Sequence, residues 1–114
     1  MDVDKNTKEK IMQLQLSEQK LQNFLMQKQQ FQGQLMEIDN ALGELDSGKG
    51  EVFRIIGNIM ISSNRDDLKK DLKEKKHILE LRIKNIEKQE EKIKEEADEI
   101  QKEVVSKLEK IKND

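Results

Sequence analysis

The sequence predicts a mainly α fold, in which two long helices pair as an antiparallel coiled coil and are joined by one β-hairpin. Three observations predict this fold. Of the 114 residues, 40% are charged and only 3% aromatic, with no Pro and no Cys, which is typical of long helices and unsuited to a compact core. Apolar residues recur with a heptad period on both sides of the centre. A short run rich in Val and Ile lies between the two heptad patterns.

The first predicted helix extends from about residue 7 to residue 45. Its apolar side chains alternate in steps of three and four, which is the a/d pattern of a coiled-coil seam, and only Lys28 interrupts it. The seam consists of Leu21, Phe24, Lys28, Phe31, Leu35, Ile38, Leu42 and Leu45. Nine Gln lie between Gln13 and Gln34, mostly outside the seam, and such a stretch is typical of a solvated helix surface.

The second predicted helix extends from about residue 64 to residue 112. Ser63 is its expected N-cap, and Asp66 supplies a carboxylate near the positive end of the helix. Two rows of residues with heptad spacing run along this helix. One row contains Leu72, Leu79, Ile86, Ile93 and Ile100, and the other contains Lys76, Ile83, Glu90, Ala97, Val104 and Ile111.

The two heptad patterns match each other when the helices fold back antiparallel. Most layers contain apolar or small residues if the numbers of facing residues add up to about 114, as for Leu42 and Leu72. In this register Lys28 and Glu90 fall in neighbouring layers. A charge pair there would favour the register over slipped ones at some cost in stability.

The apolar run in the middle predicts a β-hairpin within residues 51–62. We expect strands at 52–56 and 59–62 around a type II′ turn, with Gly57 in the first central position. Both faces of this hairpin are apolar, and an isolated hairpin is marginal in water, so other chains must cover it. The residues expected to mediate oligomerisation are Val52, Phe53, Ile55, Ile56, Gly57, Ile59, Met60 and Ile61.

A second candidate surface is the tip where the first helix begins and the second ends. Leu16, Val105 and Leu108 lie outside the main seam, so apolar surface is expected to remain unused by the helix pair. Met and Leu adapt to irregular partners, and several weak tips would bind with avidity. The alternative, that these residues only close the coiled coil, stays open. The candidate tip residues are Ile11, Met12, Leu14, Leu16, Val104, Val105, Leu108 and Ile111.

Charge and hydropathy argue against nucleic-acid and membrane partners. The net charge is −2, and no basic region precedes a heptad pattern, as a DNA-binding coiled coil would require. No apolar run approaches the ~18 residues that span a membrane. The N-terminus lacks the apolar core of a signal peptide, and the absence of Cys fits a reducing compartment, so a cytoplasmic protein is expected.

The sequence predicts no catalytic residue, no cofactor and no metal site, and therefore no enzyme. The segment from Gly43 to Gly50 resembles a phosphate-binding loop, but Gly50 stands where Ser or Thr would bind Mg²⁺, and the order of helix and strand is reversed. His77 is the single His and lies on a charged helix face, which is typical of a solvated side chain. The helical carboxylates would bind Ca²⁺ only weakly.

One specific stretch lies between the heptad helices and reads Val52-Phe53-Arg54-Ile55-Ile56-Gly57-Asn58-Ile59-Met60-Ile61. In this stretch the chain resembles the beta-class subunits of prefoldin. The family pattern there is Val, an aromatic, a basic residue, two apolar-leaning positions, Gly, one free position and an aliphatic run. A single hairpin indicates the beta class, because alpha-class subunits carry two. In length and in the order of its elements, the likeness covers nearly the whole chain. It therefore implies a single domain, 1–114. The short termini favour an archaeal member of the family.

This resemblance implies a heterohexamer of two alpha-type and four beta-type subunits, whose hairpins form an intersubunit double β-barrel from which six coiled coils extend. It also implies an ATP-independent chaperone, a holdase, that captures unfolded client proteins at the coiled-coil tips and transfers them to a group II chaperonin. By the same resemblance, the charged C-terminal residues 107–114 are candidates for docking to that chaperonin. The competing interpretation is a structural or tethering coiled-coil oligomer without chaperone activity, in which the hairpin only sets the oligomeric state.

Overall fold

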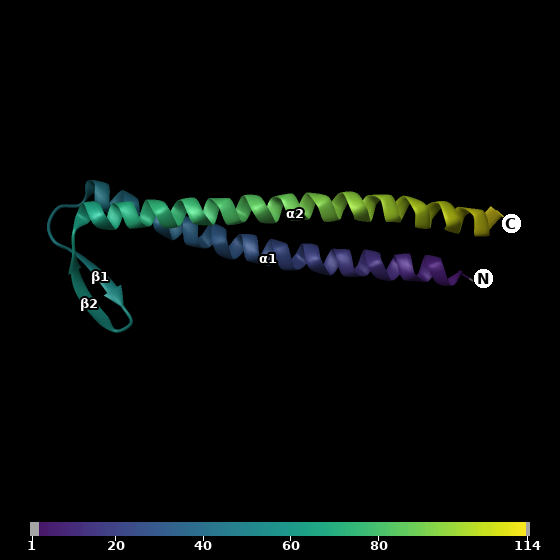
Figure 1. Cartoon of the computed structure of the whole chain (residues 1–114), viewed down its shortest axis with the longest axis horizontal. Helices are drawn as coiled ribbons and strands as arrows, with labels where there is room; N and C mark the ends of the chain where they lie inside the picture. The colour runs from purple at the N-terminus through teal and green to yellow at the C-terminus, as the bar shows by residue number, and fades with distance from the viewer. Residues whose placement is uncertain (1–2, 114) are drawn as a thin grey trace. The chain divides into compact units, whose positions relative to one another are not determined.

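The computed structural model of the chain describes residues 3–113 (Figure 1). In chain order its elements are α1 (Lys5–Ser47), β1 (Val52–Ile56), β2 (Ile59–Ser63) and α2 (Arg65–Asn113). The predicted fold is confirmed, because two long helices are joined by one antiparallel hairpin and most described residues are helical. Met1, Asp2 and Asp114 of the predicted 1–114 domain lie outside the described residues.

Helix α1 begins earlier than its heptad pattern indicates, because Asp4 caps it. The Asp4 carboxylate accepts a hydrogen bond of 2.7 Å from the backbone N–H of Thr7. At the other end, the N–H of Gly48 donates to the carbonyl oxygen of Glu44 at 2.8 Å. A Cβ on Gly48 would lie only 2.6 Å from that oxygen, so glycine is required where the helix closes.

Helix α2 is capped by Asn64, and the prediction of Ser63 as its N-cap is wrong. The side-chain oxygen of Asn64 accepts hydrogen bonds from the N–H groups of Asp66 and Asp67, at 2.9 and 3.2 Å. Ser63 is instead the last residue of β2 and pairs with Val52. Both residue types cap helices well, so only the extra strand pair, which the sequence pattern does not reveal, decides between them.

Strands β1 and β2 pair antiparallel along their full length, and Gly57 and Asn58 form the turn between them. Of the described residues, only Gly50 and Gly57 have a positive φ, of 103° and 61°. A positive φ at the first central residue of the turn but not at the second is the signature of a type II′ turn. The predicted turn type is therefore confirmed.

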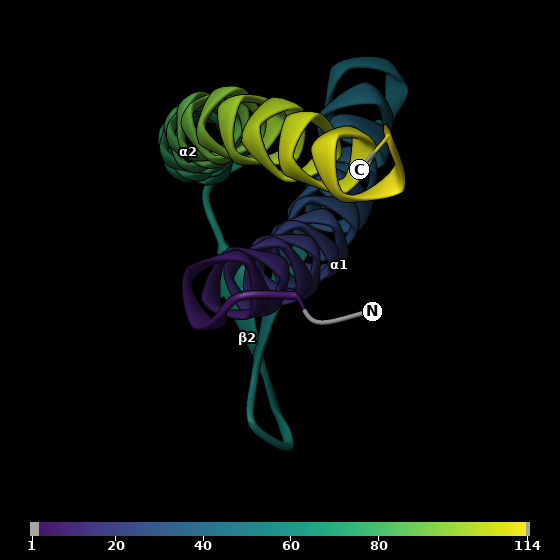
Figure 2. The same ribbon diagram turned by 90° about the vertical axis from the view of Figure 1, so that its right-hand side faces the viewer.

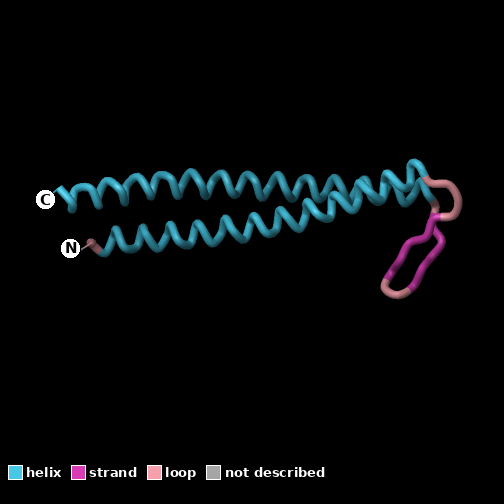
Figure 3. Tube along the Cα trace, turned by 180° about the vertical axis from the view of Figure 1, so that it is seen from behind, coloured by secondary structure: helices cyan, strands magenta, loops and turns pink. Residues whose placement is uncertain are grey.

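The chain divides into two compact units, and both helices contribute to each. The hairpin unit, Gln29–Lys84, contains the hairpin with the C-terminal part of α1 and the N-terminal part of α2. The terminal unit contains the described residues up to Lys28 and those from Asn85 onward. Within each unit α1 and α2 lie side by side and antiparallel (Figures 1 and 3).

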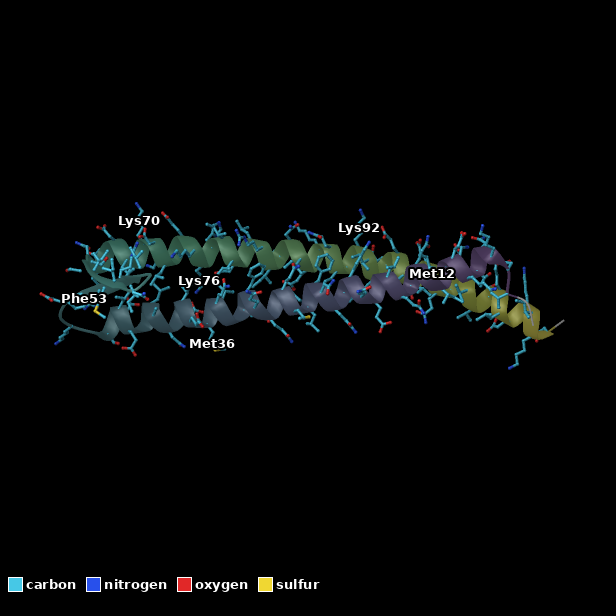
Figure 4. All side chains as sticks on the ribbon, turned by 90° about the horizontal axis from the view of Figure 1, so that it is seen from below. Met12, Met36, Phe53, Lys70, Lys76 and Lys92 are labelled. Atoms are coloured by element: carbon cyan, nitrogen blue, oxygen red, sulfur yellow. The ribbon has the colours of Figure 1, made fainter. Side chains whose placement is uncertain are left out.

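In the hairpin unit, the seams of the two helices face each other in the predicted register. Ion pairs flank the seam, Asp39 with Lys76 at 2.7 Å and Asp46 with Lys69 at 2.8 Å. The residue numbers in each pair add up to about 114, as the heptads predict. The labelled Lys76 lies between the two helices in Figure 4. The buried apolar side chains of this unit are Leu45, Leu79 and Ile83.

The terminal unit confirms the predicted pairing of Lys28 with Glu90. The Lys28 Nζ lies 2.7 Å from a carboxylate oxygen of Glu90, and the two side chains are only 20% and 10% exposed. Both occupy seam positions, next to the buried Ile86. A charge buried in an apolar seam requires its partner, so registers that separate these two residues are disfavoured.

We expect Glu90→Ala to lower the free energy of unfolding by about 2 kcal/mol, because it leaves the Lys28 ammonium partly buried without a partner. Urea denaturation followed by far-ultraviolet circular dichroism measures the change. Glu87→Ala removes an exposed carboxylate of the same helix and is the control. Replacing both partners, Lys28→Leu with Glu90→Leu, should restore or exceed wild-type stability. If Glu90→Ala and Glu87→Ala had the same free energy of unfolding, the Lys28–Glu90 pair would not stabilise the seam.

Candidate functional site

The hairpin exposes apolar side chains on both of its faces. The strand register places Phe53, Ile55 and Met60 on one face and Val52, Ile56, Ile59 and Ile61 on the other. Val52 is half-buried, whereas the other six side chains are between 46% and 68% exposed. We call these seven residues, together with the exposed turn residue Gly57, the hairpin surface. The chain alone therefore leaves this surface open to solvent.

The hairpin is held to the helices by charged and polar contacts. The Arg54 guanidinium contacts the Asp71 carboxylate of α2 at 2.6 Å. Arg65, the first residue of α2, donates to the carbonyl oxygen of Leu45 at the end of α1, and to that of Gly50 at 3.1 Å. These contacts fix the base of the hairpin, while its turn points away from α2 (Figures 1 and 2). The apolar side chains thus remain available for other contacts.

The Arg54–Asp71 pair makes this attachment dependent on pH. The hydrogen bond from Arg54 lowers the pKa of Asp71 below its ordinary value of 3.8. Because the folded pKa is the lower one, the pair stabilises the folded state fully above the ordinary value. That contribution is lost as the pH falls through the folded pKa. Asp46 behaves alike, since its hydrogen bond from Lys69 lowers its pKa.

The tip surface lies in the terminal unit, where the start of α1 and the end of α2 lie side by side (Figure 3). Lys10 pairs with Glu103, and Lys107 lies 3.4 Å from the Asp4 carboxylate. These contacts hold the two helix ends together. The hydrogen bond from Lys10 also lowers the pKa of Glu103.

The structure divides the eight candidate tip residues into two groups. Met12 and Leu16 are 61% and 55% exposed, and Val105 and Leu108 are also exposed. Val104 is buried, at 6% exposure. Ile11, Leu14 and Ile111 are half-buried in the seam. The first group, with apolar surface that the helix pair does not use, is available to a partner, and the role of all eight residues in binding stays a prediction.

Sequence reasoning missed three residues that organise these surfaces, Arg65, Asp71 and Thr7. The lone basic residue in the apolar run, Arg54, was a signal for a charged partner, but only the fold of the hairpin shows that Asp71 is that partner. Thr7 is 1% exposed, and its hydroxyl has no hydrogen-bond partner. It occupies the seam position two heptads before Leu21, which the apolar pattern did not include.

The described residues offer no cluster of three or more His, Cys, Asp or Glu side chains that could hold a metal ion. His77 is exposed and lines an open groove on α2 together with Asp66, Lys70 and Ile78. Figure 4 shows Lys70 pointing outward, on the side of α2 away from α1. Neither helix, within residues 3–113, has a stretch long and apolar enough to cross a membrane.

Comparison with known proteins relates the chain to one family. A family model described as prefoldin subunit matches residues 8–111. A prefoldin subunit beta of Pyrobaculum arsenaticum is 34% identical over 94 residues, which cover 81% of this chain and 76% of that protein. A prefoldin subunit beta of Archaeoglobus fulgidus is 38% identical over 87 residues, or 75% of each chain. The crystal structure of the prefoldin beta subunit from Thermococcus strain KS-1 superimposes with a TM-score of 0.87 at 30% identity, covering 94% of this chain and 96% of that one.

We expect the carboxyl group of Asp71 to titrate with a pKa below 3.8, and Arg54→Met to raise that pKa towards the ordinary value, because it removes the hydrogen bond that stabilises the carboxylate. A carbon-13 NMR titration of the carboxyl groups measures both. Arg82→Met is the control. The Arg82 guanidinium lies over the ring of Phe31, 5.8 Å from its centre, so its removal should leave the Asp71 carboxyl group unaffected. An unchanged Asp71 titration in Arg54→Met would show that the pair does not form in solution.

Proposed function

The chain belongs to the prefoldin family as a beta-type subunit, and we propose that it acts as an ATP-independent holdase that captures unfolded client proteins. Members of this family are chaperones rather than enzymes, and they assemble with other prefoldin subunits. The observation that carries the proposal is the presence of two separate exposed apolar surfaces, one in each unit. The hairpin surface suits permanent assembly of subunits, and the tip surface suits weak binding of a client.

The hairpin surface is the proposed assembly surface. Its strands have free edges as well as apolar faces, so neighbouring hairpins can extend the sheet and bury the exposed side chains together. Closing several hairpins into an intersubunit β-barrel removes every free edge. We therefore propose a heterohexamer of two alpha-type and four beta-type subunits, as the family resemblance implies.

The tip surface is the proposed client-binding surface. Met12, Leu16, Val105 and Leu108 offer flexible apolar contacts at helix ends, where fraying lets the surface adapt to different segments. Each tip would bind weakly, and several tips of one hexamer would hold a client with avidity. Weak individual contacts also permit release without ATP.

We further propose that the hexamer works in the cytoplasm and transfers its client to a group II chaperonin. The charged end of α2, with Glu109, Lys110 and Lys112, supplies exposed ion-pairing groups next to the tip surface, whereas the half-buried Lys107 lies near Asp4. Charged rims of this kind speed encounter and set orientation more than they add affinity. This transfer step rests on the family resemblance.

The first test concerns assembly. We expect Ile55→Asp with Ile59→Asp to convert the complex formed with a co-expressed alpha-type subunit into small species, because each change places a carboxylate in a contact that must lose its water. Native mass spectrometry and sedimentation velocity measure the mass. Ile78→Asp with Leu81→Asp puts the same charges on exposed apolar positions of α2 and should leave the mass unchanged. An unchanged mass in the hairpin variant would remove the hairpin from the interface.

The second test concerns capture. The wild-type hexamer should suppress the aggregation of an unfolded client diluted from denaturant, at near-stoichiometric amounts, as followed by light scattering. Replacing Met12, Leu16, Val105 and Leu108 together by Gln should weaken suppression about tenfold, because the exposed apolar contacts are lost while helix propensity is kept. Ile78→Gln with Leu81→Gln is the matched control. Full aggregation with wild-type protein would favour the tethering interpretation over the chaperone.

A further inference from the structure

Between Met12 and Met26 the outer face of α1 is free of charge, although 40% of the chain is charged and the exposed Lys5 and Lys8 lie on the same face nearer the start of the helix. At 100° per residue, seven exposed positions form one stripe about 120° wide along this part of the helix. All seven side chains are exposed, and none is ionisable. We call them the amide stripe: Met12, Gln15, Leu16, Gln19, Gln22, Asn23 and Met26.

The partner helix of the same unit provides a direct comparison. Its seven exposed positions with identical spacing are all charged: Lys88, Glu91, Lys92, Glu95, Asp98, Glu99 and Lys102. Figure 4 shows Lys92 pointing outward from α2. Both stripes face away from the same seam, so solvation alone does not explain why the stripe on α1 lacks charge and the stripe on α2 is filled with it.

Amide and thioether side chains suit one kind of partner, an unfolded polypeptide with an uncharged sequence. Such a segment exposes backbone N–H and C=O groups, and Gln and Asn side chains both donate and accept hydrogen bonds. Contact with this face removes no ionic group from water, which would otherwise cost free energy. Met12 and Met26, at 61% and 67% exposure, add adaptable apolar contacts.

The stripe is continuous with the tip surface, because Met12 and Leu16 belong to both. We propose that the client-binding surface extends from the tip along the outer face of α1 to Met26, and that this extension takes uncharged segments of unfolded polypeptides. This inference rests on the proposed holdase function. It assigns the charged face of α2 to solvation, so the two helices of one arm have different roles in capture.

Charge insertion at the centre of the stripe tests this assignment. Gln15→Glu, Gln19→Glu and Gln22→Glu together change the side-chain shape very little and the net charge by −3. The same positions changed to Lys give the opposite charge. The matched control is Lys88→Gln, Lys92→Gln and Lys102→Gln, which lowers the net charge by the same amount within the corresponding stripe of α2. All variants are assembled with the alpha-type partner.

The readout is the affinity for fluorescently labelled, reduced and carboxymethylated α-lactalbumin, a permanently unfolded protein, measured by anisotropy. Both the Glu and the Lys triple variants should bind about tenfold more weakly than wild type, since a desolvated charge opposes contact whatever its sign. The α2 control should bind as wild type does. Native mass spectrometry is expected to give the wild-type mass for every variant.

Other outcomes overturn the assignment in distinguishable ways. Wild-type affinity in both stripe variants would confine capture to the tip and leave the holdase function intact. If only the Glu or only the Lys triple variant bound the probe more weakly, or if the α2 control lost as much affinity, the effect would be long-range electrostatics and not contact with the stripe. A changed mass would identify the stripe as a subunit contact. Failure of the wild-type hexamer to bind the unfolded probe would overturn the proposed function and the stripe with it.

Discussion

The antiparallel seam between α1 and α2 is the interaction on which the rest of the structure depends. It buries few side chains, and those are spread along two long helices, so no compact core competes for the remaining apolar residues. In the hairpin unit the seam brings the end of α1 next to the start of α2, where Arg65 can join them. In the terminal unit it brings Lys10 to Glu103 and so aligns the two helix ends. Both exposed surfaces are therefore consequences of one register.

That register is specified by polar residues as much as by apolar ones. A heptad seam made only of Leu and Ile would tolerate a slip of seven residues, because each layer resembles the next. The Lys28–Glu90 pair removes this freedom, since a slip would leave one partly buried charge without its partner. Asp39 with Lys76 and Asp46 with Lys69 repeat the constraint at the edge of the seam. The charged layer of Lys28 and Glu90 is less stable than an apolar layer would be, but it defines the register and therefore which residues form the hairpin base and the tip.

Most of the fold could be predicted from the sequence because its signals are local and periodic. Heptad spacing fixed the two helices and their register, and Gly57 at the first central turn position fixed the turn type. The errors arose where two local signals compete, as at Ser63 and Asn64, which are both good N-caps. Of the candidate site, the exposure of Leu16, Val105 and Leu108 followed from their positions outside the seam. The Arg54–Asp71 contact did not, because it depends on the angle at which the hairpin leaves the helices.

The distribution of charge links this architecture to its proposed use. A chain that exposes large apolar side chains such as Ile55 and Met60 needs strong solvation elsewhere to remain dispersed, and the charged outer face of α2 supplies it. If both helices carried such a face, an unfolded client would meet ionic groups on every side and would have to strip water from them to bind. Placing most of the helical charge on α2 leaves the outer face of α1 between Met12 and Met26 free to present amides and thioethers. Asymmetry between two paired helices therefore resolves the conflict between staying in solution and holding an unfolded chain.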